Sequence, residues 1–375
     1  MRNLASIQMI VDVEPIEGAD MIEKVTVLGW EIVVAKKDGF KPPDKVIYVE
    51  IDSVMPDRPE YEFLRPRKFR IRTIKLKGQV SQGLVLPIKG SPLEGKNVTI
   101  GQDVTEEMGI TKYLTPSERE ENSGSESKLR RSRNPLVRYM MKYAWFRKMM
   151  LRKKSSESWP KWVSKTDEER IQNMPGCLRK FADEVVYVTE KVDYQSATFT
   201  SGNAPKFNGL IGRLLPFKNV KLIVCSRNMP NHNKASLYWK IAEKYKMEDI
   251  LRRNPNITIQ GEQGDTKVQG NKYKITEPTL WVFDVYDHVA KKHFGFIEMQ
   301  EFCDKWGLQT VPFVTEKRLG DIGSTVQELV QFSRGKSLIN KDVHREGVVI
   351  RCVRDGKKIL SFKVINPDFL LKYED

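Results

Sequence analysis

The chain has 375 residues, too many for one ordinary hydrophobic core, so we expect two domains. Its formal net charge of +15 favours a polyanionic partner, which is either nucleic acid or an anionic membrane surface. The four cysteines are widely spaced, which argues against a zinc site or a disulfide framework, and no apolar run approaches the roughly 18 residues of a membrane span. We therefore expect a soluble, intracellular protein that does not enter a membrane.

Residues 1–110 alternate short β-rich runs with turns. The runs lie at 4–13, 24–35, 44–52, 69–78 and 82–88. Strands of this length and spacing predict a small all-β barrel. Seven basic residues fall in one predicted β region: Arg65, Arg67, Lys68, Arg70, Arg72, Lys75 and Lys77. The cluster suits a face that tracks phosphates, although a solvated strand edge protected by charge gives the same pattern.

The composition changes between residues 111 and 160. The stretch TPSEREENSGSESK has the composition of a flexible linker. From Lys128 to Lys165, thirteen lysines and arginines stand against one acid, Glu157. Within this segment, residues 136–154 place apolar and basic side chains at helical spacing. Three alternatives fit: a basic helix on nucleic acid, an interfacial membrane helix, or a helix packed between domains.

Residues 161–375 have the pattern of a mixed α and β domain. The strand-like runs lie at 184–192, 220–227, 256–263, 279–287, 346–353 and 358–365, and the helical ones at 235–253 and 297–307. Strand-to-strand hairpins outnumber strand–helix–strand units, which predicts an antiparallel α+β domain. The sequence has neither a Walker-type loop nor a GxGxxG loop, which argues against P-loop and Rossmann nucleotide sites.

Lysines and acids on or beside these strands carry the candidate chemistry: Lys191, Asp193, Glu262, Glu346 and Lys363. Their order and settings resemble motifs I, III, IV and V of the covalent nucleotidyltransferases, with CSRN at 225–228 and VFDV at 282–285 similar to motifs Ia and IIIa. Segments outside the site, among them MRNLASIQMI, PIEGAD and KTDEERIQN, resemble an ATP-dependent RNA ligase family. The likeness covers nearly the whole chain, and the basic segment aligns least well.

The resemblance implies an OB-fold domain over 1–110, a basic linker or helical segment over 111–160, and a nucleotidyltransferase (ligase adenylation) domain over 161–375. It implies an ATP-dependent RNA ligase with three steps: adenylation of a lysine, transfer of AMP to a 5′-phosphate, and attack by a 3′-OH with release of AMP. The expected cofactors are ATP and Mg²⁺ or Mn²⁺. The expected partner is RNA, as a nicked duplex or as free ends, and we expect a monomer.

The acids are expected to act through a metal ion. A lysine amine attacks ATP only when it is unprotonated, and its reference pKa of about 10.4 makes that form rare at pH 7. Three carboxylates around Lys191 would stabilise the ammonium and raise its pKa, whereas a divalent cation among them would favour the neutral amine and lower that pKa. We therefore expect Asp193, Glu262 and Glu346 to position the waters of a hard dication.

The resemblance also implies a set of nucleotide contacts: Glu190, Lys191, Arg170, Arg227, Phe283 and Lys363. In this set Phe283 stacks on adenine, and Lys363 neutralises charge that grows on the α-phosphate. The expected catalytic residues are Lys191, Lys363 and Asp193. Each residue taken singly has a plain structural explanation, such as a hairpin end or a core aromatic, so the ordered combination carries the inference.

Two positions depart from the family pattern. Tyr194 stands where the family favours glycine, and if the backbone there needs a positive φ, tyrosine costs about 1–2 kcal/mol and misplaces the nucleophile. Ser361 stands where many related DNA ligases have a first lysine, so we expect one lysine contact to phosphate. A catalytically weakened or inactive RNA-binding relative and a DNA ligase stay open as alternatives. Retention of the lysines and acids favours an active enzyme.

Overall fold

The structure is a computed structural model that describes residues 3–114, 139–140, 142–143, 159–165, 167–202, 221–227 and 229–373. The chain divides into two compact units, Met1–Ser156 (unit 1) and Glu157–Asp375 (unit 2). Almost all of the basic segment lies outside the described residues, so its three alternatives stay predictions. Within the described parts of the chain, no helix has the length and apolar character needed to cross a membrane.

Unit 1 is built mainly from strands. They are β1 (Ala5–Pro15), β2 (Ile22–Val27), β3 (Trp30–Ala35), β4 (Lys45–Val49), β5 (Ser53–Val54), β6 (Thr73–Leu76), β7 (Gln79–Gln82), β8 (Leu84–Pro87) and β9 (Thr111–Lys112). Five of them form an antiparallel sheet in the order β3-β2-β1-β4-β8. The predicted run 24–35 is therefore two strands joined by a tight turn.

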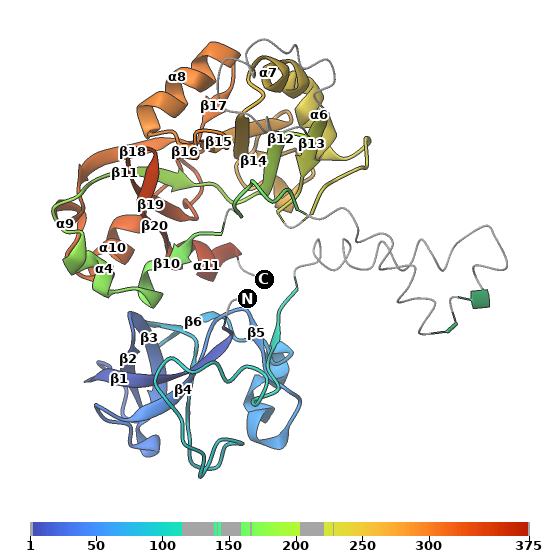
Figure 1. The fold of residues 1–375 in the computed structure, drawn as a ribbon. Coiled ribbons are helices and arrows are strands. Elements are labelled where there is room, and N and C mark those ends of the chain that lie inside the picture. The colour runs from blue at the N-terminus through green and yellow to red at the C-terminus, as the bar shows by residue number, and fades with distance from the viewer. Residues whose placement is uncertain are drawn as a thin grey trace. The chain divides into compact units, whose positions relative to one another are not determined.

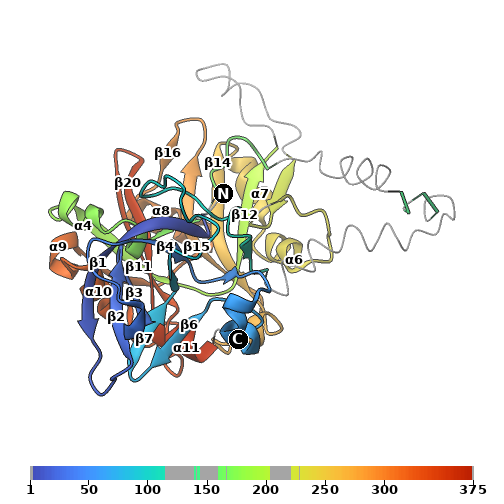
Figure 2. The same cartoon turned by 90° about the horizontal axis from the view of Figure 1, so that it is seen from below.

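Strand β1 is long enough to serve both halves of this sheet. Its first part, from Ala5 to Met9, pairs with β4, and its second part, from Ile10 to Pro15, pairs with β2. The register shifts just after Ile10, as expected where a strand bends sharply. Figure 2 shows β1 curving across the unit. The result is a curled half-barrel around a core that includes Trp30.

The predicted basic β region of unit 1 is not a single strand, and that expectation is wrong. Arg65 and Arg67 end a 3₁₀ helix, η2 (Pro59–Arg67), whereas Lys75 lies on β6. The physical reason lies between them, because Lys68 has a left-handed backbone (φ 52°) that breaks an extended chain. A run of charged and β-prone residues in the sequence gave no sign of this turn.

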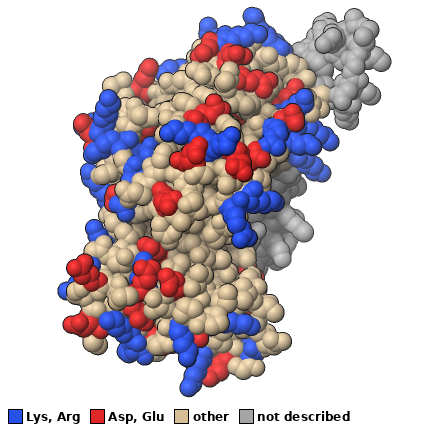
Figure 3. Space-filling view, turned by 90° about the vertical axis from the view of Figure 1, so that its left-hand side faces the viewer, with Lys and Arg blue, Asp and Glu red and all other residues tan. Residues whose placement is uncertain are grey.

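Two arginines of this cluster are held in ion pairs. Arg65 pairs with Asp57 at 2.9 Å and also with a second acid in η2. Arg70 is buried, donates to Asp52 at 2.8 Å and lies over the ring of Tyr113. On the face drawn in Figure 3, lysine and arginine side chains are interspersed with acidic ones. Ion pairs within unit 1 therefore neutralise some of the basic side chains that were expected to contact phosphates.

Unit 2 contains two sheets, and the first has helices against one face. Its strands are β10 (Glu169–Arg170), β20 (Lys357–Ile365), β19 (Gly347–Arg354), β11 (Val185–Lys191) and β18 (Phe313–Arg318), in that order. The helices are α4 (Gly176–Lys180), α9 (Leu319–Ile322) and α10 (Val326–Ser333). Their apolar side chains share one core with β11, β19 and β20, around Ile350 and Phe362 (Figure 1).

The second sheet of unit 2 packs against three other helices. Its strands are β13 (Leu222–Cys225), β12 (Gln195–Ser201), β14 (Ile257–Gly264), β15 (Thr279–Asp287), β16 (Lys292–His293) and β17 (Gln309–Thr310). The helices are α6 (Leu237–Lys244), α7 (Met247–Arg253) and α8 (Phe296–Trp306), and a last helix, α11 (Pro367–Tyr373), follows β20. Both sheets are antiparallel except for β10–β20 and β15–β17, which confirms the predicted α+β arrangement.

The helical run predicted over 235–253 is two helices. Lys246 adopts a left-handed backbone between α6 and α7, and it ends the first helix there. The two helices nevertheless bury one apolar set, including Ile241 and Ile250, against the second sheet. The apolar spacing continues across the break, so the sequence predicted the buried face correctly and missed the bend.

Candidate active site

Lys191 is the last residue of β11, at the point where the chain leaves the first sheet for β12 of the second. Its amine donates to Glu346 Oε2 at 2.7 Å, and Glu346 directly precedes the neighbouring strand β19. Glu262 and Asp193 lie close enough to act on the charge of Lys191. The structure thus brings the predicted nucleophile and all three predicted acids together at the junction of the two sheets.

The charge balance of this cluster opposes a neutral amine. Burial lowers the pKa of Lys191, but the carboxylates of Glu346, Glu262 and Asp193 outweigh it, and the net pKa is raised. Burial, together with the neighbouring carboxylates, raises the pKa of Glu262 to about 8. The pKa of Glu346 is raised for the same reasons. Without further positive charge, Lys191 is therefore an ammonium ion and a poor nucleophile.

A hydrated dication suits this set of donors. Carboxylate oxygens are the ligands that Mg²⁺ and Mn²⁺ prefer, and Glu262, Glu346 and Asp193 bring three of them near the amine of Lys191. Among the described residues, no three acidic, histidine or cysteine side chains are grouped closely enough to hold a metal ion directly. Contact through the waters of the ion, as the sequence predicts, agrees with that spacing and stays a prediction.

Asp193 is held by the loop that joins β14 to β15. The amine of Lys272 pairs with Asp193 Oδ2, and the hydroxyl of Tyr273 accepts the backbone N–H of Asp193 at 3.1 Å. Sequence reasoning missed Lys272 because no motif surrounds it. It is one of many lysines in a polar stretch, and its partner lies 79 positions away in the chain.

Tyr194 is accommodated without the backbone strain considered above. It is not among the residues with a positive φ. Its ring is 5% exposed and stacks on Trp281 with centroids 5.8 Å apart, and its hydroxyl donates to Asn271 at 3.0 Å. Gly264 lies beneath the ring, where an added Cβ would come within 2.6 Å of it. The tyrosine fits because a glycine on β14 makes room for its ring.

A group of cations also lies near Lys191. Arg170 and Lys363 are register partners on the parallel strands β10 and β20, and Arg227 pairs with Asp167. Burial, together with Arg170, Lys191 and Arg227, lowers the pKa of Lys363 to about 7. Concentrated positive charge of this kind is an arrangement that binds phosphate groups.

Glu190 and Phe283 have different surroundings from this cluster. Glu190 precedes the nucleophile on β11, so its side chain points to the opposite face of the sheet, where its carboxylate accepts the N–H of Leu338 at 2.7 Å. Phe283 is partly buried and packs against the cluster of Tyr194, Tyr273 and Trp281. Their predicted nucleotide contacts stay predictions.

Comparison with known proteins shows the family to which the chain belongs. A family model described as RNA ligase matches residues 184–365, and an OB-fold domain model matches residues 4–88. A solved structure of a Naegleria gruberi RNA ligase with pyrophosphate is 30% identical, with a TM-score of 0.77 over 100% of both chains. The chain belongs to the RNA ligase family. The predicted OB-like domain and nucleotidyltransferase domain are thereby confirmed.

Further structures of the Naegleria gruberi enzyme match this RNA ligase equally well. A glutamate-to-alanine mutant with ATP and manganese is 30% identical, and a lysine-to-methionine mutant with AMP and manganese is 29% identical. Each match has a TM-score of 0.77 and covers 100% of both chains. A comparison with curated proteins finds no match.

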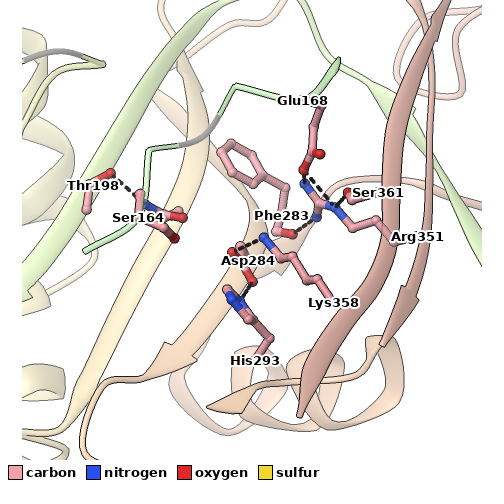
Figure 4. Close-up of polar contacts among 10 residues, drawn as sticks. Ser164, Glu168, Thr198, Phe283, Asp284, His293, Arg351, Lys358 and Ser361 are labelled. Carbon is pink, nitrogen blue, oxygen red and sulfur yellow. Dashed lines mark hydrogen bonds and ion pairs between the residues drawn. The ribbon is translucent and has the colours of Figure 1, made fainter. Parts of the chain in front are cut away.

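Arg351 is a residue of this RNA ligase that sequence reasoning missed. It lies on β19 and is 3% exposed, with Glu168 accepting from its guanidinium at 2.8 Å and the backbone carbonyl of Phe283 accepting on another side. Figure 4 shows Arg351 between these two partners. The available signal was an arginine inside the apolar run EGVVIRCV, because a buried charge needs fixed partners.

The same arginine explains the departure at Ser361. The two residues are directly opposite each other on β19 and β20, and the Ser361 hydroxyl accepts from Arg351 at 3.2 Å. A lysine at 361 would set a second positive charge opposite a buried arginine, which is unfavourable. Serine at this position therefore follows from the way Arg351 is held.

Asp284 provides a second link between the two sheets. It is buried on β15 and pairs with Lys358 of β20 at 2.7 Å and with His293 at 3.0 Å. Burial raises its pKa, but Lys358 and His293 outweigh this effect and hold the pKa well below its usual range. The carboxylate is thus charged at neutral pH, and Figure 4 shows the three side chains meeting.

Proposed function

We propose that the chain is an ATP-dependent RNA ligase that joins 3′-OH and 5′-phosphate ends through AMP bound covalently to Lys191. The observation that carries the proposal is the Lys191 amine, which contacts Glu346, is influenced by Glu262 and Asp193, and lies near the cation Lys363. Arg170 and Arg227 in turn lie near Lys363. An amine beside concentrated positive charge suits attack on a phosphate ester.

The ligands of the related structures support ATP as the substrate. One of the Naegleria gruberi structures holds ATP with manganese, another AMP with manganese, and a third pyrophosphate. These are the reactant, the transferred group and the leaving group of lysine adenylation. The family name supports RNA as the polymer that is joined.

In the proposed reaction, Lys191 Nζ loses its proton and forms a bond to the α-phosphorus of ATP, and the bond from that phosphorus to the bridging oxygen breaks. Pyrophosphate leaves with the electron pair. An oxygen of the RNA 5′-phosphate then attacks the same phosphorus and frees the lysine amine, after which a 3′-OH attacks the 5′-phosphorus and AMP leaves. Lys363 offsets the negative charge that grows on the α-phosphate.

The chain's own acids account for the metal requirement. When a dication is bound, its positive charge opposes that of the ammonium and favours the neutral amine. Asp193, Glu262 and Glu346 are the residues that would hold its waters, and Glu346 also holds the amine in place at 2.7 Å. We further propose that residues 1–110 act as an OB-fold domain, that the basic segment 111–160 contacts RNA, and that residues 161–375 act as the adenylation domain. We also propose that the protein acts as a monomer.

The test of this function has two stages. The protein is incubated with ATP and either Mn²⁺ or Mg²⁺, and intact mass analysis should show an AMP adduct. It is then given nicked duplexes with RNA or DNA on the 3′-OH side, and we expect sealing when that side is RNA. Absence of an adduct with both metals, together with RNA binding, would favour the inactive relative, and equal sealing of all-DNA nicks would favour a DNA ligase.

Lys363 gives a pH-dependent prediction. Its pKa is lowered to about 7, so at pH 8 the free protein holds it largely neutral. Phosphate groups favour the ammonium and raise that pKa, so ATP binding at pH 8 should take up about one proton, and the uptake should fade below pH 7. Calorimetry in two buffers of different ionisation enthalpy measures it. An equal uptake by Lys363→Met would contradict the assignment.

A further inference from the structure

Four side chains of one loop hold Asp193 and Tyr194, shortly after the nucleophile. Gln269 donates to the backbone carbonyl of Tyr194 at 3.0 Å, and Asn271 accepts the hydroxyl of the same tyrosine at 3.0 Å. Two more, Lys272 and Tyr273, hold the carboxylate and the backbone N–H of Asp193, as described above. The loop is therefore built to fix the turn at residues 193–194.

Lys272 has a second set of neighbours in α11. Its amine lies 4.9 Å from the ring centroid of Phe369 and 5.7 Å from that of Tyr373. These two rings also contact each other, with centroids 4.9 Å apart. A lysine amine near aromatic rings is stabilised by the negative electrostatic potential of the ring faces, even away from a carboxylate.

Two of the three acids beside the nucleophile are each paired with a lysine. Lys191 pairs with Glu346, and Lys272 pairs with Asp193. Both pairs are partly shielded, since 27% of the Lys191 side chain and 21% of the Lys272 side chain are exposed. The ammonium groups of Lys191 and Lys272 repel any further cation. Because Lys191 is the proposed nucleophile and has to stay in place, Lys272 is the group that an entering cation can displace.

We propose that Lys272 is the resident counter-ion of Asp193, and that a divalent metal ion entering the site displaces it toward the rings of Phe369 and Tyr373. The inference rests on the proposed function, because it concerns the metal that the ligase reaction needs. In the metal-free protein Lys272 neutralises Asp193 and keeps its carboxylate oriented. In the loaded protein the rings hold the amine, and Asp193 faces the waters of the ion. Lys272 is accordingly a positioning residue.

The test measures binding of Mn²⁺ alone, from the electron paramagnetic resonance signal of the free ion. Lys272→Gln removes the competing charge, so the Kd for Mn²⁺ should fall by about tenfold. Lys272→Arg keeps the charge and should bind as the wild type does. Tyr373→Leu removes a ring that receives the displaced amine, so the Kd should rise by about threefold. A lower Kd in Lys272→Gln together with a higher Kd in Tyr373→Leu is expected only if the amine of Lys272 moves from Asp193 toward the rings.

Lys274→Gln is the matched control. It removes the same charge from the same loop, but the Lys274 amine pairs with the exposed Asp342 at 3.2 Å, so Mn²⁺ binding should not change. An unchanged or weaker Mn²⁺ affinity in Lys272→Gln overturns the inference. If Lys272→Gln fails to fold, the Kd of Tyr373→Leu decides: a rise supports the inference, and an unchanged or lower value overturns it. A wild type that forms no AMP adduct contradicts the ligase proposal and leaves the Mn²⁺ comparison intact as a separate result.

Discussion

Lys191→Ala is expected to abolish the AMP adduct completely. The substitution removes the Nζ atom that forms the bond to phosphorus, and a methyl group offers no lone pair in its place. The arginines that lie near this position stay protonated and do not substitute as nucleophiles. Intact mass analysis after incubation with ATP and Mn²⁺ should show the unmodified mass alone, whereas the wild type shows an adduct.

The control for this prediction is another lysine of unit 2. Lys244, on α6, pairs with Glu277 at 3.0 Å on the surface, and Lys244→Ala should adenylate as the wild type does. Lys191→Ala should still join RNA that already carries a 5′-adenylate, because that step uses a 3′-OH as nucleophile. An adduct on a different lysine in Lys191→Ala would show that the nucleophile has been assigned wrongly.

Tyr194→Gly restores the residue that the family favours, and it is expected to destabilise unit 2 by about 3–5 kcal/mol without speeding adenylation. The ring fills a buried place between Trp281 and Tyr273, and Gly264 leaves the space for it. Its loss opens a cavity, and glycine also increases the freedom of the unfolded chain. Urea unfolding, followed by tryptophan fluorescence, measures the loss.

Tyr194→Phe separates the ring from its hydroxyl. It keeps the stacking and loses one hydrogen bond to Asn271, so we expect a cost of about 1 kcal/mol and an adduct yield close to the wild type. A Tyr194→Gly protein of unchanged stability that adenylates faster would mean that the tyrosine strains the turn, contrary to the packing described above.

The sequence predicted a set of residues that meet at the candidate site and could not predict the residues that support them. Lys191, Glu346 and Lys363 stand in ordered motifs at strand ends, and the predicted strands at 184–192, 279–287 and 346–353 are confirmed. The motif order is a property of the chain alone. It therefore gives a candidate set before any contact between residues is known, and the roles of its members stay predictions.

The supporting contacts depend on pairs that are far apart in the chain. Tyr194 looked unfavourable because the glycine that accommodates it lies on another strand, and Lys272 reaches Asp193 only through the path of a loop. Left-handed residues such as Lys246 and Lys68 also gave no signal, since lysine has no particular preference for that backbone. Such features follow from tertiary structure, which local patterns do not encode.

The buried carboxylate of Asp284 has a consequence for the way unit 2 comes apart. One of its partners belongs to the other sheet, so pulling the sheets apart would strand a desolvated charge at a cost of about 3–5 kcal/mol. We therefore expect the two sheets of unit 2 to open together, so that amide protons of β14 and β20 exchange in the same event. The nucleophile stands at that seam.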